Sequence, residues 1–338
     1  MSAEPTVSVL IPCHNAAPYV GAALDSVLSQ TWRRLEVIVV DDGSTDGSAA
    51  ILAGYARRGV RVIHQQNAGA SAARNRALEA STGAFILFMD ADDLINPEHI
   101  ASLHAVIADA PRVIAMSQWD RFTVCPDEAR FPNRATYRDA PGADWLAQDW
   151  AEAGSMTQCG MFLVPRAVLA ETGGWDERLT LIDDFELYAR VIAASAGVRY
   201  AEGARLYYRS GLGGSLSGAR SRKAVESAFL SLMLGTGHLL AAEDSPRTRR
   251  ACANVLQDFD YAYYPANADL REKVRARIAE LGGSDLAPSG PPGFQRLRRI
   301  VGWRGARRVQ LLAERLRLNR AARRPLLRRR HRASGVLS

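Results

Sequence analysis

Short apolar runs alternate with stretches of helical periodicity throughout residues 1–116. The apolar runs predict β-strands at 7–11, 35–40, 60–64, 85–89 and 113–116. The stretches between them predict helices at 18–29, 48–57, 71–81 and 97–110. Since parallel neighbours require crossover connections, this alternation predicts an α/β fold, a Rossmann-like, mostly parallel sheet flanked by helices. Ligands bind such sheets at the carboxyl ends of the strands.

The pattern is less regular after residue 116. No element is predicted over 117–154, which is rich in Pro, Asp and Arg. Farther on, the pattern predicts strands at 161–164, 198–200 and 206–208, and helices at 184–194, 222–242, 247–263 and 269–281. The chain is therefore divided into two halves of one domain, a helical extension, a Pro- and Gly-rich linker and a tail, with bounds 1–116, 117–220, 221–285, 286–293 and 294–338.

The charge is distributed unevenly along the chain. Residues 294–338 contain 15 Arg and one Glu, or +14, so the remaining 28 basic and 35 acidic residues give −7 for residues 1–293. Apolar residues interleave with these Arg residues, which predicts a basic amphipathic helix or, as the alternative, a disordered, solvated tail. An amphipathic basic helix suits an anionic membrane surface, whereas the acidic body argues against nucleic acid as a partner.

The cysteines and the amino terminus bear on location. Cys13, Cys125, Cys159 and Cys252 are far apart and form neither a zinc motif nor a disulfide framework. No signal peptide is predicted, because a basic segment followed by a long apolar one is missing. The uncharged, mostly apolar stretch 227–242 has 16 residues and falls short of a bilayer span. We expect a cytoplasmic protein, with the tail as a means of peripheral attachment to the inner face of the cell membrane.

The sequence "FMDADD", residues 88–93, ends an apolar strand on Asp90, Asp92 and Asp93. Like charges beside a low-dielectric core repel one another, so they must be neutralised or titrate abnormally. Asp90 and Asp92 can converge on one Mg²⁺ or Mn²⁺, which takes one or two protein carboxylates and completes its coordination with phosphate oxygens. The motif therefore predicts a site for a metal and a diphosphate. The alternative is three exposed carboxylates in a turn.

Five motifs occur in order between residue 6 and about residue 215. They are "VSVLIPCHN", "VIVVDDGSTDGS", "NAGASAARNRAL", "FMDADD" and "GGWDERL...DDFELYAR". With this ordered set the chain resembles a family 2 glycosyltransferase of the GT-A fold. The resemblance implies transfer of a sugar from a nucleotide-sugar donor with inversion, assisted by a divalent cation.

The resemblance also assigns roles to individual residues. It implies that Asp42 contacts the uracil of a UDP-sugar and that Arg74 faces the nucleotide and its diphosphate. It gives Asp92 the direct metal contact and Asp90 the ribose or a metal-bound water. The donor pocket is expected to include three residues after the first strand and one before a helix, Pro12, His14, Asn15 and Gly69. His14, where the family usually has an aromatic residue, and Asn15 have alternatives as a surface loop residue and a helix cap.

A sugar transfer also needs a base for the acceptor hydroxyl. In "LIDDFELYAR" the family has an acidic pair, usually Glu-Asp, and this chain has Asp183 and Asp184. The resemblance favours Asp184 as the general base, whereas Asp183 is interpreted as a helix cap. Trp175 is a candidate platform for a sugar, with a core position as the alternative. Arg209 and Ser215 resemble a segment that closes over the diphosphate, with a solvent loop as the alternative.

The motifs predict a metal-dependent glycosyltransferase that moves a single sugar to a saccharide or lipid-linked acceptor in surface polysaccharide or glycolipid biosynthesis. Processive relatives carry transmembrane helices and a Gln-x-x-Arg-Trp motif, and neither is found in the sequence, so single transfer is favoured. One alternative is a sugar nucleotidyltransferase, although "PCHNAAPYV" lacks the Gly-rich, basic loop that holds a triphosphate. The other is a catalytically silent nucleotide-sugar-binding protein, against which the intact Asp42, Asp92 and Asp184 argue.

Overall fold

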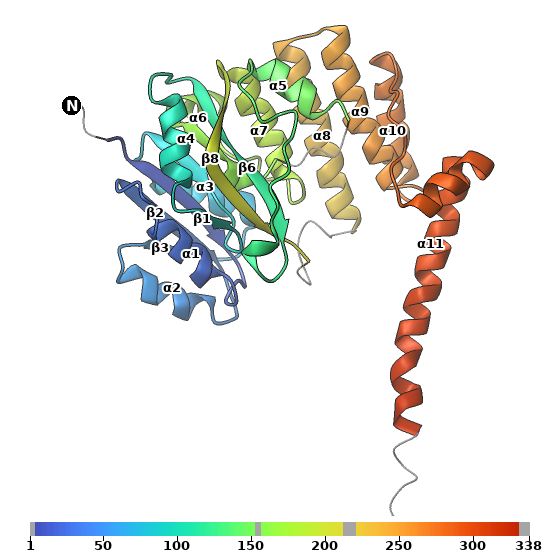
Figure 1. Cartoon of the computed structure of the whole chain (residues 1–338), viewed down its shortest axis with the longest axis horizontal. Helices are drawn as coiled ribbons and strands as arrows, with labels where there is room; N and C mark the ends of the chain where they lie inside the picture. Colours follow the sequence, from blue (N-terminus) through green and yellow to red (C-terminus); the bar gives the residue numbers. More distant parts are fainter. Residues whose placement is uncertain (1–3, 153–156, 212–220, 331–338) are drawn as a thin grey trace, which may run out of the picture.

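The computed structural model describes residues 4–152, 157–211 and 221–330, with side chains up to 314 and at 316. An eight-stranded sheet with the order β3-β2-β1-β4-β7-β6-β8-β5 forms the centre of the body and is flanked by helices (Figure 1). The strands are β1 Val7–Cys13, β2 Leu35–Asp42, β3 Arg61–Gln65, β4 Phe85–Phe88, β5 Leu94–Ile95, β6 Val113–Phe122, β7 Phe162–Pro165 and β8 Gly197–Arg209.

The helices alternate with the strands in the first half of the chain and follow one another in the last third. They are α1 Val20–Leu28, α2 Ser48–Ala56, α3 Ala70–Ala80, α4 His99–Ile107, α5 Gly142–Asp149, α6 Arg166–Thr172, α7 Asp183–Ala194, α8 Arg222–Ala242, α9 Pro246–Ala262, α10 Ala268–Glu280 and α11 Pro292–Arg330. The predicted fold class is thus confirmed.

The sheet is parallel on one side and mixed on the other. β3, β2, β1 and β4 pair in parallel, as do β6 and β8. β7 pairs antiparallel with both β4 and β6, and β5 pairs antiparallel with β8. Every residue of β1 except Pro12 is buried, because this strand has neighbours on both edges and helices over it. The parallel strands bring the carboxyl ends of β1, β2 and β4 to one edge.

The second half of the sheet and the segments that connect its strands contain longer strands and additional short elements that the sequence pattern did not predict. β6 continues to Phe122, and the two short strands predicted at 198–200 and 206–208 are parts of one long strand, β8. A register shift between Ser117 and Gln118 marks the place where β6 and β8 lose regular pairing, which explains why the alternation of apolar residues breaks there. The short elements β5, α5 and α6 were not predicted either, since each is too brief to show a period.

The helix α8 packs on the sheet domain. It is long and apolar enough to span a membrane, but half of its most apolar segment is buried inside the protein. Its contacts with α7 and α9 explain that burial, and the core helix of a globular protein has the same composition. No helix had been predicted to span a membrane, and α8 gives only weak grounds for one.

The last helix, α11, runs away from the body (Figure 1). Gly302, with φ 71°, interrupts its helical geometry, so α11 consists of two helical segments that meet at this residue. Beside the interruption, the Trp303 ring lies against Tyr261 and Tyr264, with centroid distances of 4.8 and 5.0 Å. These contacts attach the start of the tail helix to α9 and to the segment that follows it.

Candidate functional site

The acidic sequence after β4 lies at the edge where the parallel strands end. Burial, together with the charge of Asp90, raises the pKa of Asp92 from 3.8 to about 6. No other described residue donates a hydrogen bond to the Asp92 carboxylate. Asp93 is 1% exposed, and its pKa is raised well above the usual value by burial and by Asp92. Burial and mutual repulsion therefore favour the neutral forms of Asp92 and Asp93 at this corner.

Arg74 on α3 connects this corner to the start of α7. Its guanidinium donates to Asp90 Oδ1 at 2.7 Å and to Asp183 Oδ2 at 2.8 Å. Arg74 is 6% exposed, so both ion pairs are largely shielded from water. Its remaining donor, Nε, is buried without a hydrogen-bond partner among the described residues. Arg74 joins two acidic motifs that are about a hundred residues apart in the sequence, and its predicted contact with the nucleotide and diphosphate stays a prediction.

Asp183 and Asp184 occupy the first turn of α7, but neither is its N-cap residue. The N-cap residue is Ile182, with φ 50°, and its side chain makes no capping hydrogen bond. The prediction that Asp183 caps α7 is therefore wrong, because its carboxylate instead accepts from Ser71 Oγ at 3.0 Å and from Arg74. Ser71 was not identified from the sequence, since its partner lies 112 residues away.

The Asp184 side chain is partly exposed beside this ion-pair network. Burial, and next the charge of Asp183, raises its pKa from 3.8 to about 8. The only hydrogen bond donated to its carboxylate among the described residues comes from its neighbour's backbone, Phe185 N, at 2.8 Å. Asp184 thus retains oxygen lone pairs that can accept a proton, and its pKa lies near neutral pH, as general-base catalysis requires.

The carboxylate of Asp42 at the end of β2 organises the loop before α3. It accepts hydrogen bonds from Gln65 Nε2 and from the backbone N–H groups of Ala68 and Gly69, at 2.8, 2.8 and 2.9 Å. A carboxylate offers roughly four acceptor positions, so about one is left for an N–H group of a ligand. Gly69 has φ 96°, which favours glycine, and the space where a Cβ would point is open.

The segment after β1 contacts the same loops. His14 is exposed, and its Nδ1 lies 2.9 Å from the Asp42 carbonyl oxygen. Asn15 does not cap α1, whose N-cap is Tyr19; its Oδ1 accepts from Thr45 N at 2.8 Å and so holds the turn after β2. Pro12 is paired with Val40 of β2 and lies at intermediate depth. The residues at the ends of β1 and β2 that were predicted to bind the nucleotide sugar are therefore neighbours.

Trp175 does not lie at a surface where a sugar could stack. It is 4% exposed, and the Arg74 guanidinium lies 4.3 Å from its ring centroid. The Phe88 ring meets it edge to face at 5.2 Å. Asn75 holds its backbone, accepting from Trp175 N at 2.8 Å and donating to Trp175 O at 2.9 Å. The core alternative is the one the structure has, and Trp175 supports Arg74.

Arg209, the last residue of β8, reaches the acidic corner. Its backbone N–H donates to Asp93 Oδ1 at 2.8 Å and its Nε donates to the Asp92 carbonyl at 2.9 Å. Its guanidinium also lies 4.4 Å from the Phe122 ring centroid and 5.0 Å from that of Tyr19. Arg209 thus places a positive charge beside the carboxylates. Ser215, predicted for the same segment, lies outside the described residues.

The oxygen donors at this corner fit a hard divalent cation. Across the described residues, no three His, Cys, Asp or Glu side chains are grouped so that they could hold a metal by themselves. Mg²⁺ and Mn²⁺ bound with a nucleotide need only one or two carboxylates, because phosphate oxygens and water supply the remaining ligands. Asp92 meets this need with an uncompensated carboxylate, and Asp90 retains Oδ2, since only its Oδ1 is bonded to Arg74.

The amino-acid sequence of the part of the chain that forms most of this site also matches a known family. Residues 8–173 match the model of glycosyl transferase family 2. The matched segment, 166 of the 338 residues, runs from β1 to the end of α6, and this part of the chain belongs to the family. The ordered motifs that carried the resemblance therefore identified the family correctly.

Several curated proteins resemble the same part of the chain. The uncharacterized glycosyltransferase YibD of Escherichia coli (strain K12) is 46% identical over 29% of this chain and 29% of its own length. Glycosyltransferase GlyA of Streptococcus pneumoniae is 34% identical over 36% of this chain and 18% of its own length. The matched segments thus span less than half the length of these relatives.

Solved structures show the fold over a larger part of the chain. A structure of TarS 1-349 from S. aureus in complex with UDP-GlcNAc superposes with a TM-score of 0.64 and 20% identity, covering 82% of this chain and 80% of that one. The mannosyltransferase PcManGT from Pyrobaculum calidifontis, in complex with GDP-Man and Mn²⁺, gives a TM-score of 0.52 at 18% identity and covers 94% of this chain and 81% of that one. At these identities the likeness establishes the GT-A-like fold.

Proposed function

We propose that this chain is a metal-dependent, inverting glycosyltransferase that transfers a single sugar from a UDP-sugar to a saccharide or lipid-linked acceptor. The observation that carries the proposal is the position of Arg74, which brings the Asp90 and Asp183 carboxylates to one guanidinium. The acidic end of β4 and the acidic start of α7 therefore form one site. Sugar transfer requires that the groups that bind the donor's diphosphate lie close to the base that deprotonates the acceptor hydroxyl.

Each group has a role that its surroundings support. Asp42 offers its remaining acceptor position to an N–H of the base, and Arg209 adds positive charge near the diphosphate. Asp92 and Asp90 would hold a divalent cation, which when bound stabilises negative charge on the departing nucleoside diphosphate. Asp184 accepts the proton of the acceptor hydroxyl as that hydroxyl attacks the anomeric carbon. Attack opposite the leaving group inverts the anomeric configuration.

Two solved structures of similar fold support a nucleotide-sugar donor. TarS is in complex with UDP-GlcNAc, and PcManGT is in complex with GDP-Man and Mn²⁺. Uridine and guanosine donors are therefore the first to be compared for this chain. We extend the proposal to a role in surface polysaccharide or glycolipid synthesis and to an anionic membrane surface as partner, reached through α11.

The experiment is a panel of sugar nucleotides, each incubated with and without Mn²⁺ and with acceptor extracts, with nucleotide release as the readout. A glycosyltransferase releases UDP or GDP in a metal-dependent reaction. A sugar nucleotidyltransferase would release no nucleoside diphosphate from these donors, but would form pyrophosphate when given a nucleoside triphosphate and a sugar 1-phosphate. A silent binding protein would bind UDP in calorimetry without turnover. Either outcome would refute the proposal.

Two variants separate the proposed roles. Asp92→Asn is expected to lose activity together with the response to added Mn²⁺. Asp184→Asn is expected to bind UDP and Mn²⁺ as the unmodified protein does, yet to lose transfer by about 10²- to 10⁴-fold, the usual contribution of a general base. Normal transfer by Asp184→Asn would show that another group is the base.

A further inference from the structure

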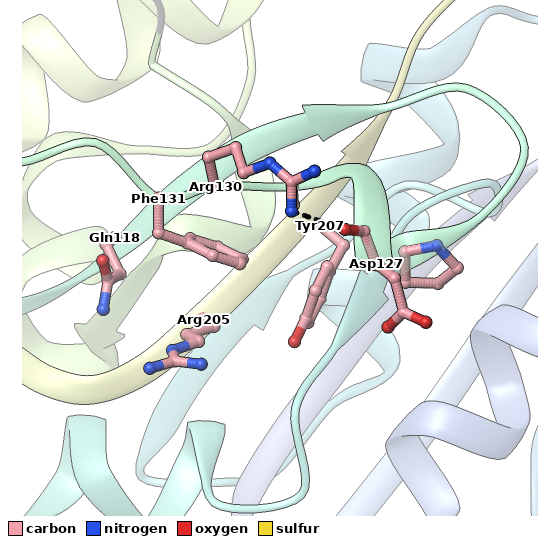
Figure 2. A pocket seen from close by; sticks show the side chains of 8 residues that line it. Gln118, Asp127, Arg130, Phe131, Arg205 and Tyr207 are labelled. Carbon is pink, nitrogen blue, oxygen red and sulfur yellow. Dashed lines mark hydrogen bonds between the residues drawn. The ribbon is translucent and has the colours of Figure 1, made fainter.

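A groove of about 470 Å³ lies over β6, β8 and the loop that follows β6. Figure 2 shows its lining side chains, most of which are polar or aromatic and which come from segments far apart in the sequence. Those used below define the Arg205 groove: Gln118, Asp127, Arg130, Phe131, Arg205 and Tyr207. Neither the family motifs nor the proposed donor site includes any of them.

One wall of the Arg205 groove is held in a strained conformation. Phe131 has φ 49°, a value that bulky residues rarely adopt. The Asp120 carboxylate holds it there by accepting from the backbone N–H groups of Arg130 and Phe131, at 2.7 and 3.1 Å. The Phe131 ring then meets the Tyr207 ring edge to face, with a centroid distance of 5.0 Å. Strain of this kind persists at binding sites because it fixes a side chain in place.

The Arg205 groove also has an excess of positive charge. Arg130 and Arg205 have no carboxylate partner among the ion pairs of the described residues, and Asp127 is the one acidic side chain in the lining. Arg130 donates to the Asp127 carbonyl, and the Arg205 guanidinium lies 5.3 Å from the Phe131 ring centroid. Guanidinium groups bind carboxylates and phosphates through paired hydrogen bonds, and aromatic rings pack against the apolar faces of sugars.

We propose that the Arg205 groove binds an anionic saccharide, a sugar chain that carries a carboxylate or a phosphate group. This inference rests on the proposed function and deepens it, since the occupant is the acceptor glycan. Tyr207 and Arg209 lie two positions apart on β8, so their side chains share a face and are separated by roughly 7 Å. Arg209 contacts the Asp92 carbonyl, which places the groove beside the acidic corner.

The test measures equilibrium binding of defined saccharides to the full chain by calorimetry. The ligands are a uronic-acid oligosaccharide, the matched neutral oligosaccharide, and a sugar phosphate. The unmodified protein is expected to bind one or both anionic ligands at least tenfold more tightly than the neutral one, since hydrogen bonds from a guanidinium to a carboxylate or phosphate are stronger than those to a neutral hydroxyl. Which anionic ligand binds decides between carboxylate and phosphate.

Two variants locate the binding. Arg205→Ala removes a guanidinium, and Phe131→Gly removes the ring while suiting the positive φ. Each is expected to weaken anionic binding about tenfold and to leave UDP binding unchanged. Arg33→Ala, which changes another exposed arginine outside the groove, is the matched control and is expected to have no effect. In the unmodified protein, the anionic ligand is expected to slow amide hydrogen exchange over 126–131.

Equal affinity for the neutral and anionic ligands, or binding that survives Arg205→Ala while exchange over 126–131 is unaltered, would overturn the inference. The readouts keep it distinct from the proposed function. Saccharide binding without any UDP or metal response would support the groove and contradict the transferase. UDP turnover with no saccharide binding in the groove would support the transferase and contradict the proposed role of the groove.

Discussion

Arg74 is the residue on which the geometry of the proposed site depends most. Its side chain is 7% exposed and is shared by two carboxylates, whereas Arg76, on the outside of α3, is 59% exposed and lies 3.8 Å from Glu79. The sequence shows both as arginines two positions apart. Their environments differ because only Arg74 points to the inner face of the helix.

We predict that Arg74→Met lowers the free energy of unfolding by about 3–5 kcal/mol, because it leaves Asp90 and Asp183 charged and unpaired in a shielded site. Arg76→Ala should lower it by less than about 1 kcal/mol, as expected of an exposed ion pair. Urea denaturation in metal-free buffer measures both, so that no bound cation can compensate. Equal losses in the two variants would contradict the bridging role of Arg74.

The pKa of Asp184 predicts the pH dependence of transfer. A base must be deprotonated, and burial and Asp183 raise the pKa of Asp184 to about 8. The rate should therefore increase as pH rises from about 6 to 9, with an ascending limb near 8 rather than near the ordinary value of 3.8. The measurement is kcat/KM against pH with acceptor varied. Asp184→Glu should shift this limb, and a rate that falls over the same range would exclude Asp184 as the base.

At the residue scale, the sequence indicates which side chains are polar at strand ends but not what they contact. Asp42, Asp90, Asp92 and Asp184 could be selected because motifs and strand ends mark them. The role of Asp183 was missed because its partners, Ser71 and Arg74, come from α3, more than 100 residues earlier. No local pattern contains such a contact.

At the scale of elements, α8 holds the start of α7. Ser227 Oγ accepts from the backbone N–H groups of Thr180 and Leu181, at 2.7 and 3.0 Å, and Ser231 Oγ donates to the Ile182 carbonyl at 2.6 Å. These bonds fix the loop directly before Asp183 and Asp184, including Ile182 with its φ of 50°. The helical extension therefore positions the proposed base, although the sequence pattern shows it only as an apolar helix.

Two glycines of α8 test this packing. A Cβ on Gly235 would lie 2.5 Å from Phe185 Cε1 and 2.8 Å from Cδ1, whereas a Cβ on Gly237 would meet nothing within 4 Å. We predict that Gly235→Ala destabilises the protein by about 1–3 kcal/mol through overpacking and lowers transfer, since Phe185 follows Asp184. Gly237→Ala should stabilise it by about 0.5–1 kcal/mol through helix propensity. Thermal denaturation and transfer activity are measured for both variants. The melting temperature is expected to fall in Gly235→Ala and to rise in Gly237→Ala.

At the scale of the whole molecule, the sequence predicted the order of most elements and the basic tail. It could not predict how the tail is attached, because the contacts of Trp303 with Tyr261 and Tyr264 join segments that no periodicity relates. Beyond Trp303, α11 exposes Val309, Leu312 and Leu316, which are 51%, 58% and 55% exposed. Their spacing of three and four places them on one face of the helix.

This exposed apolar face, within a tail of net charge +14, predicts binding to anionic membranes. Each basic residue near such a surface contributes about 1 kcal/mol, and salt screens the attraction. We expect the full chain to sediment with phosphatidylglycerol vesicles but not with phosphatidylcholine vesicles, and less as salt increases. Replacing Val309, Leu312 and Leu316 by Ser keeps every charge and should weaken sedimentation, while truncation after Gln310 removes the helix yet retains Trp303 and should abolish it. Vesicle binding that is the same for the truncated and the full chain would show that α11 has another role.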